Sequence, residues 1–304
     1  MIPQRTGFLC AVGIFLDEKH IMDEWVSHYL REGVDHLFLI DNGSTDDPYD
    51  TLYKHKDKVT VFYDAKRHSQ FGLYQKYCFD LCKRFDWVLV CDLDEFMYSK
   101  NGFKTIAEYL KQLPDDVAQV CVPWKMFGSS GRNSLACPED EKQPAEIVPN
   151  FTFRSNYDRR NGFQGVKYGK KRGRPNKRVK FSYNKSLVRT SALRRFHVHS
   201  HELYPNSGRS VSSYLGPHYG LGHQLFRGTR FAGIDESVIA HSALNLNHYP
   251  IQSLEWFKKV KMTRGAVDAA SGDHIRDLQY FQNYDQCSND LEDLELAQKR
   301  KEAV

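Results

Sequence analysis

WVLVCDLDEF, residues 87–96, joins an apolar run to an acidic turn. An uninterrupted apolar run as short as Trp87 to Cys91 is typical of a strand buried on both faces of a parallel sheet. In an extended backbone Asp92 and Asp94 would point the same way, and Leu93 would point back into the protein. Three carboxylates within four positions repel one another unless a cation lies among them, and Mg²⁺ or Mn²⁺ commonly fills that role. A solvated acidic turn is the alternative explanation.

Hydrophobic periodicity on both sides of this stretch predicts an α/β fold. Periods of two and of three to four residues alternate over the first 125 residues, which is typical of a mostly parallel sheet flanked by helices. The predicted strands are residues 8–16, 36–40, 59–63, 87–91 and 118–122, and the predicted helices are residues 21–33, 71–85 and 105–110.

The second half is predicted to be richer in loops. From Gly128 to about Lys180 the pattern weakens into glycine, proline, asparagine and charge. Strands are expected again from Ser186 and from Phe196 to His199. Ser253 is a candidate N-cap for a helix that stops at Gly265, and the charged residues 290–304 are expected to form a frayed helix or tail.

The chain is therefore divided, as an expectation, into three parts. Residues 1–127 would form an α/β half. Residues 128–265 would complete the same domain, with a basic insertion at 154–195, and residues 266–304 would form a helical C-terminal tail.

Composition narrows the class of protein. The chain has 304 residues, of which 40% are hydrophobic and 27% charged, as in soluble globular proteins. Its longest apolar stretch, Phe8 to Leu16, is well short of the ~20 residues that span a bilayer, so neither a membrane span nor ordinary secretion is expected. Seven cysteines without CxxC spacing favour reduced thiols and a cytoplasmic location, and Cys78 and Cys82 would share a buried helix face.

Basic charge is concentrated in one segment. Residues 154–195 contain 15 lysines and arginines against a single acid, Asp158. Such a segment attracts anionic partners, including sugar phosphates, acidic glycans and nucleic acids. Within it, Lys170 to Pro175 resembles the core of an AT-hook, so a nucleic-acid-binding protein is one alternative function, although short basic motifs often arise by chance.

A second acidic loop runs from Asp41 to Asp46, again at the end of a predicted strand. An Asx turn that caps a helix would explain these residues alone. Because the carboxyl ends of parallel strands lie at one edge of a sheet, this loop and the Asp92 turn are expected to form a single site there.

Three alternating histidines, His197, His199 and His201, form a third feature. On a strand they would face one side, as in a metal chelate or an acceptor subsite, so a histidine-metal hydrolase is the other alternative function. A polar strand face would give the same pattern. Glu202 follows directly and is a candidate general base.

Several short segments between about Phe8 and Gly265 have a characteristic order and spacing: Glu24 to Val26, Gly33 to Asp35, Asp41 to Asp46, Trp87, Asp92 to Phe96, Trp124, Phe127 to Gly131, Asn247 to Tyr249, Ser253, Phe257, Lys258, and Arg264 with Gly265. Taken in this order, they resemble glycosyltransferases of families 2 and 92. The resemblance implies a GT-A fold, a nucleotide-sugar donor such as a UDP-sugar, a bound Mn²⁺ or Mg²⁺, inverting transfer and a glycan or glycoprotein acceptor. Residues 1–127 would then be the nucleotide-sugar-binding α/β half, and residues 128–265 the acceptor side.

The resemblance also implies roles for single residues. Asp41, with Asn42 beside it, would contact the base of the nucleotide. Asp94 would be the direct metal ligand, Asp92 would lie toward the ribose or a metal-bound water, and His248 would complete the metal site. Independently of the resemblance, the position of Glu202 after the histidine triplet makes it the candidate general base; Glu95 is its competitor, although a structural role beside the metal is expected for Glu95.

One departure from the family pattern falls after the first strand. The family usually has asparagine before the glutamate there, whereas this chain has Asp17 before Glu18. A donor contact is expected at these two positions.

Overall fold

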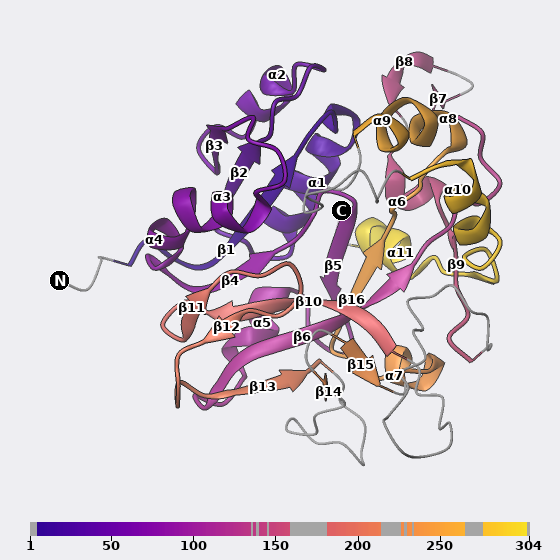
Figure 1. Ribbon diagram of the computed structural model, residues 1–304. Helices are drawn as coiled ribbons and strands as arrows, with labels where there is room; N and C mark the ends of the chain where they lie inside the picture. Colours follow the sequence, from indigo (N-terminus) through magenta and orange to yellow (C-terminus); the bar gives the residue numbers. More distant parts are fainter. Residues whose placement is uncertain are drawn as a thin grey trace, which may run out of the picture.

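The computed structural model describes residues 5–134, 136–137, 140–144, 146–158, 181–213, 226–227, 230–232, 234–264 and 276–302. Its centre is one curled mixed sheet with the strand order β3-β2-β1-β4-β10-β6-β16-β5 (Figure 1). Of these strands, β10 and β5 run opposite to the others. The predicted α/β fold with a mostly parallel sheet is thus confirmed. The strands are β1 (Gly7–Phe15), β2 (His36–Asp41), β3 (Val59–Tyr63), β4 (Phe85–Val90), β5 (Glu95–Ser99), β6 (Val117–Met126), β10 (Phe181–Arg189) and β16 (Leu244–His248).

Alternation along the strands sends side chains into two cores. In β1, Leu9 and Ala11 join the core that contains α1 (Lys19–Arg31) and α5 (Ile106–Lys111). Cys10 and Val12 join the opposite core, which contains α3 (Gln70–Tyr77) and α4 (Phe79–Cys82). Helices therefore cover both faces of the parallel half, and its strand ends are free to carry loops.

Local capping signals fix several helix ends. α1 ends before Gly33, whose φ of +86° suits glycine. Thr105 and Ser253 cap α5 and α8 (Leu254–Trp256) by accepting bonds from the backbone N–H groups of Glu108 and Trp256. The helix after Ser253 continues through a π-helical turn, η1 (Phe257–Lys261), into α9 (Met262–Arg264).

Two predicted elements differ from the structure. The helix expected over residues 71–85 is broken at Cys78 into α3 and α4, although Cys78 and Cys82 do share a buried face as expected. The strand expected from Phe196 to His199 is wrong: β11 (Leu193–Arg195) ends first, and Phe196 turns into the core beside α3 and α4.

The second half holds short elements between its loops. They are β7 (Ala136–Cys137), β8 (Asp140–Pro144), α6 (Ile147–Asn150), β9 (Phe153–Arg154), β12 (Glu202–Leu203), β13 (Arg209–Ser212), β14 (Phe226–Arg227), β15 (Arg230–Ala232), α7 (Glu236–Ala240) and α10 (Leu278–Asp285). In the first half, α2 (Tyr49–Tyr53) precedes β3.

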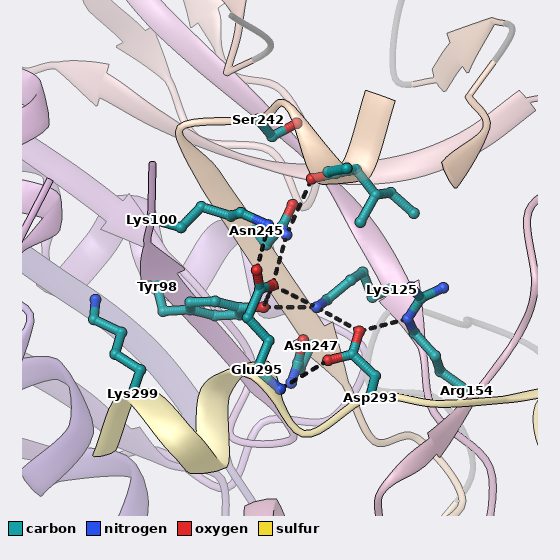
Figure 2. A network of polar contacts seen from close by, with 12 residues as sticks. Tyr98, Lys100, Lys125, Arg154, Ser242, Asn245, Asn247, Asp293, Glu295 and Lys299 are labelled. Atoms are coloured by element: carbon teal, nitrogen blue, oxygen red, sulfur yellow. Dashed lines mark hydrogen bonds and ion pairs between the residues drawn. The ribbon is translucent and has the colours of Figure 1, made fainter. Parts of the chain in front are cut away.

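The C-terminal segment is packed and not frayed, contrary to expectation. β17 (Leu291–Glu292) pairs with β9, and α11 (Glu295–Glu302) buries Leu296 in the main core. Its acids meet a buried lysine of β6: Lys125 Nζ lies 2.8 Å from Asp293 Oδ2 and 3.3 Å from Glu295 Oε2 (Figure 2). Hydrogen bonds and charge pairs thus hold residues that the sequence pattern shows only as a charged run.

Six cysteines among the described residues are free thiols: Cys10, Cys78, Cys82, Cys91, Cys121 and Cys287. None of the described helices combines the length and the hydrophobicity required to cross a bilayer.

Candidate functional site

The two acidic loops lie at one edge of the sheet. Asp41 is the last residue of β2, and Asp92 follows the end of β4. β1 lies between these strands and runs parallel to both, with Phe15 opposite Asp41 and Val12 opposite Val90. The expected common edge is confirmed, although the two strands are separated by β1.

The carboxylate of Asp41 accepts hydrogen bonds from the loop that follows β2. Its Oδ1 accepts hydrogen bonds from the N–H groups of Gly43 (3.1 Å) and Ser44 (2.7 Å), and its Oδ2 accepts one from the Tyr49 hydroxyl (2.6 Å). Asp41 is fully buried. The Asx turn expected from the sequence is therefore present, and Tyr49 covers the remaining carboxylate oxygen.

Asp17 fastens the loop after β1 to the same turn. Its Oδ1 accepts bonds from the N–H (2.6 Å) and hydroxyl (3.0 Å) of Thr45, and its own N–H donates to Ser44 Oγ. Asn42 ties the turn to the next loop by donating to the carbonyls of Asp64 and Lys66. The loops after β1, β2 and β3 thus form one connected rim.

A cleft of about 990 Å³ opens beside this rim. Asp17, Thr45 and Asp46 line one part of it, and His20 and Trp256 line another. The rim therefore faces a space large enough for a small ligand.

The second acidic loop is a turn and not an extended segment. The N–H of Glu95 donates to the carbonyl of Asp92 at 3.1 Å, and residues 93 and 94 form the turn. The expected extended geometry of Asp92 and Asp94 is wrong, because the chain must leave β4 here for β5, which pairs with β16 further along the sheet. Leu93 is buried as expected.

A buried lysine of β10 holds one side of this turn. Lys185 Nζ lies 2.8 Å from Asp92 Oδ2 and 3.4 Å from Glu95 Oε2. Gln70 of α3 donates to the other oxygen of Asp92 at 3.1 Å. Asp92 therefore already has protein partners on both oxygens, and its side chain stays one-third exposed.

A second buried lysine holds the other side. Lys261 Nζ, at the end of η1, lies 2.7 Å from Asp94 Oδ2 and 3.9 Å from Glu18 Oε1. Asp94 Oδ1 lies 3.5 Å from His248 Nε2. The turn is thus enclosed by two cations and an imidazole that come from three distant parts of the chain.

Asp94, Glu95 and His248 form the one group of three candidate metal ligands within the described part of the chain. Their ligand atoms all lie within 4.8 Å of one another, and all three residues are buried. Glu95 Oε1 and His248 Nδ1 are buried without a hydrogen-bond partner. Two carboxylates and an imidazole suit a divalent ion such as Mn²⁺ or Mg²⁺, so the residues present fit a metal.

Burial and charge set the protonation states of this group. Burial raises the pKa of Asp94, but Lys261 and His248 outweigh it and hold the pKa well below its usual value. Burial lowers the pKa of His248, which favours the neutral imidazole that binds metals. Burial also raises the pKa of Glu95 well above its usual value, which favours the protonated acid.

The three histidines expected on a strand have different surroundings. His199 Nδ1 lies 2.9 Å from the carbonyl of Asn184, and its ring packs against Trp124, whose own ring lies 4.3 Å from that of His248. His201 Nδ1 accepts from the N–H of His197, and burial lowers the pKa of His201 to about 3. The triplet is therefore not the metal-ligand group of the described residues.

Glu202 is the first residue of β12, which pairs with β11. It forms a 3.1 Å ion pair with Arg194 of β11, and its side chain is 40% exposed. The basic run from Lys170 to Pro175 lies outside the described residues.

Sequence reasoning missed Lys185 and Lys261 as site residues. For Lys261 a signal exists, because it follows the buried Phe257 by four residues and so lies on the same helix face. For Lys185 there is none, since β10 is buried on both faces and shows no alternation.

A sequence model described as Glycosyltransferase family 92 matches residues 7–263. A search of curated proteins found no match for the chain.

Solved structures with similarity to the chain include S. aureus TarS 1-349, with 13% identity and a TM-score of 0.34 over 66% of this chain and 52% of TarS 1-349. The same protein in complex with UDP has 13% identity and a TM-score of 0.33, over 62% of this chain and 48% of that chain. A third structure is glucosyl-3-phosphoglycerate synthase from Mycobacterium tuberculosis in complex with Mn²⁺, UDP and glucosyl-3-phosphoglycerate. It has 15% identity and a TM-score of 0.25, over 40% of this chain and 45% of that chain. The chain thus spans about half the length of the solved structures it matches.

Proposed function

Because the chain belongs to glycosyltransferase family 92, we propose that its acidic sheet edge binds a divalent ion and a UDP-sugar, and that it transfers the sugar to a glycan hydroxyl. The observation that carries this proposal is the buried group of Asp94, Glu95 and His248 at the edge where Asp41 also lies. Ligands of open α/β sheets bind at this edge, beyond the carboxyl ends of the strands.

Asp94, Glu95 and His248 would hold the ion, which is proposed to be Mn²⁺ or Mg²⁺. When bound, such an ion neutralises the negative charge that develops on a departing diphosphate. The low pKa of Asp94 keeps its carboxylate ionised for that purpose. Asp92 would serve the ribose or a metal-bound water, as the family resemblance implies, with Gln70 and Lys185 fixing its orientation.

The rim formed by Asp17, Asn42 and Asp41 would receive the nucleotide. Asp41 Oδ2 accepts its hydrogen bond from the exposed Tyr49, so the N–H of uracil would take the place of that hydroxyl. Asp17 and Glu18 would contribute at the loop after β1, where Asp17 has a φ of +52° and already meets Thr45.

For the inverting transfer that we propose, one carboxylate must accept the proton of the acceptor hydroxyl. The raised pKa of Glu95 makes it a poor base in this state. Glu202 is more exposed than Glu95 and lies outside the proposed metal group, so it is the better candidate.

A thermal-shift panel of UDP and UDP-sugars, with and without Mn²⁺, tests this function. We expect selective stabilisation by UDP with Mn²⁺, because a ligand of the folded state raises the melting temperature. Asp94→Ala should abolish the Mn²⁺-dependent shift and sugar transfer while the protein stays folded by circular dichroism. Unchanged turnover in Asp94→Ala would remove the proposal.

A further inference from the structure

Lys261 is an unusual helix lysine. It is 5% exposed, whereas the neighbouring Lys258 and Lys259 are exposed. Its Nζ lies 2.7 Å from Asp94 Oδ2 and 5.1 Å from the centre of the Trp256 ring. A buried ammonium group is costly unless it is paired, and Asp94 is the nearer of two carboxylate partners of this lysine, with Glu18 Oε1 at 3.9 Å.

The backbone turns Lys261 inward. α8 is α-helical up to Trp256, η1 is a π-helical turn that ends at Lys261, and α9 resumes the α-helix. A π-helical turn accommodates one more residue than an α-helical turn and so changes which face the next side chain occupies; such turns are frequent at functional sites. Here the last residue of that turn is the one that reaches Asp94.

Lys261 and the proposed metal ion need the same carboxylate. The ion would be held by Asp94 with Glu95 and His248, and the ammonium group already neutralises Asp94 from the other side. Two positive charges a few ångströms apart in a buried site repel each other, so the ammonium group of Lys261 would oppose binding of the ion.

We propose that Lys261 is an internal competitor of the divalent ion: it neutralises Asp94 in the ion-free protein and weakens ion binding until a nucleotide diphosphate is present. The diphosphate supplies the negative charge that Lys261 and the ion then share, so nucleotide and ion bind cooperatively. This inference rests on the proposed metal site, and it makes Lys261 a positioning residue that acts through Asp94.

Mn²⁺ binding measured directly tests the competition. The free-ion signal in electron paramagnetic resonance is followed during Mn²⁺ titration of the wild type, Lys261→Met and the matched exposed control Lys258→Met, each with and without UDP. Without UDP, Lys261→Met should bind Mn²⁺ about tenfold more tightly than the wild type, because the repelling charge is gone. UDP should tighten Mn²⁺ binding strongly in the wild type and in Lys258→Met, but much less in Lys261→Met.

A change in Mn²⁺ affinity in the opposite direction overturns the inference. If Lys261 only supported the structure of the site, its loss would weaken Mn²⁺ binding with and without UDP. Weaker or unchanged Mn²⁺ affinity in Lys261→Met therefore rejects the competition while leaving the metal site in place. If neither the wild type nor any variant binds Mn²⁺, with or without UDP, the metal site itself is rejected and the inference with it.

A measurement on the wild type covers the case in which Lys261→Met does not fold. Amide hydrogen exchange of residues 254–264 should speed up at saturating Mn²⁺ without UDP, because Lys261 then loses Asp94 with no diphosphate to pair with. Exchange that is unchanged or slower would overturn the proposal.

Discussion

Lys185 Nζ lies 2.8 Å from Asp92 Oδ2 and 3.4 Å from Glu95 Oε2, so one buried lysine of β10 joins two residues of the acidic turn. Its position depends on tertiary structure, because β10 inserts between β4 and β6 and runs antiparallel to both. Burial lowers the pKa of Lys185, but Asp92 and Glu95 outweigh it and raise the pKa well above its usual value. The lysine is therefore charged at neutral pH and balances the turn.

Lys185→Met should destabilise the protein by about 3 kcal/mol. Removing one partner of a buried ion pair costs roughly 3–5 kcal/mol, and the lower end applies because Asp92 is one-third exposed. Urea unfolding measures the change. Lys76→Met is the matched control, since Lys76 is 60% exposed in its pair with Asp64 and its loss should change the stability little. Equal urea midpoints for the two variants would contradict the prediction.

Much of the parallel half could be predicted because its signals are local. The bounds of β3 match the apolar run from Val59 to Tyr63, and Gly33 and Ser253 end or begin helices as their residue types indicate. The position of the two acidic loops at one edge of the sheet could also be predicted, since the carboxyl ends of parallel strands lie on the same side. These features need only sequence period and backbone geometry.

The rest of the site depends on contacts between distant segments. Glu95, Lys185 and His248 lie far apart in the sequence and meet because β10 and β16 enter the sheet from the second half. The charged C-terminal run resembled a solvated tail, because its buried partner Lys125 lies in a mostly apolar strand far away in the sequence. Pairing of buried charges therefore accounts for what periodicity alone does not predict.

Two glycines should respond oppositely to alanine. A Cβ at Gly128 would lie 2.5 Å from Asn289 Oδ1 and 2.6 Å from the carbonyl oxygen of Ser288, whereas a Cβ at Gly72 in α3 would meet nothing within 4 Å. Gly128→Ala should cost about 1–3 kcal/mol through overpacking, and Gly72→Ala should gain about 0.5–1 kcal/mol by stiffening the unfolded chain. Urea unfolding measures both, and a stable Gly128→Ala protein would show that the Ser288 segment can move aside.

Acid should weaken the attachment of the C-terminal segment. Burial raises the pKa of Glu295, but Lys125 and the bonds from Lys100 and Tyr98 outweigh it and lower the pKa from 4.5 to about 2. A carboxyl group with a depressed pKa stabilises the fold above its unfolded pKa, and this contribution is lost as the pH falls from about 4.5 to about 2. The difference in free energy of unfolding between the wild type and Glu295→Gln should thus be largest at neutral pH. It should decrease as the pH falls from about 4.5 to about 2. A difference that stays constant down to the acid limit would show that the charge of Glu295 contributes nothing.

Replacing Glu202 or Glu95 by glutamine tests which of the two is the general base. Glu202→Gln should lower sugar transfer by about 10²-fold or more, because glutamine cannot accept the proton of the acceptor hydroxyl, while binding of UDP with Mn²⁺ stays as in the wild type. Glu95→Gln should weaken the Mn²⁺-dependent binding of UDP itself, since Glu95 belongs to the proposed metal group. Release of UDP in the presence of acceptor measures transfer, and thermal shift measures binding, with Glu255→Gln on the exposed side of α8 as the control. A Glu202→Gln enzyme with wild-type turnover would exclude Glu202 as the base.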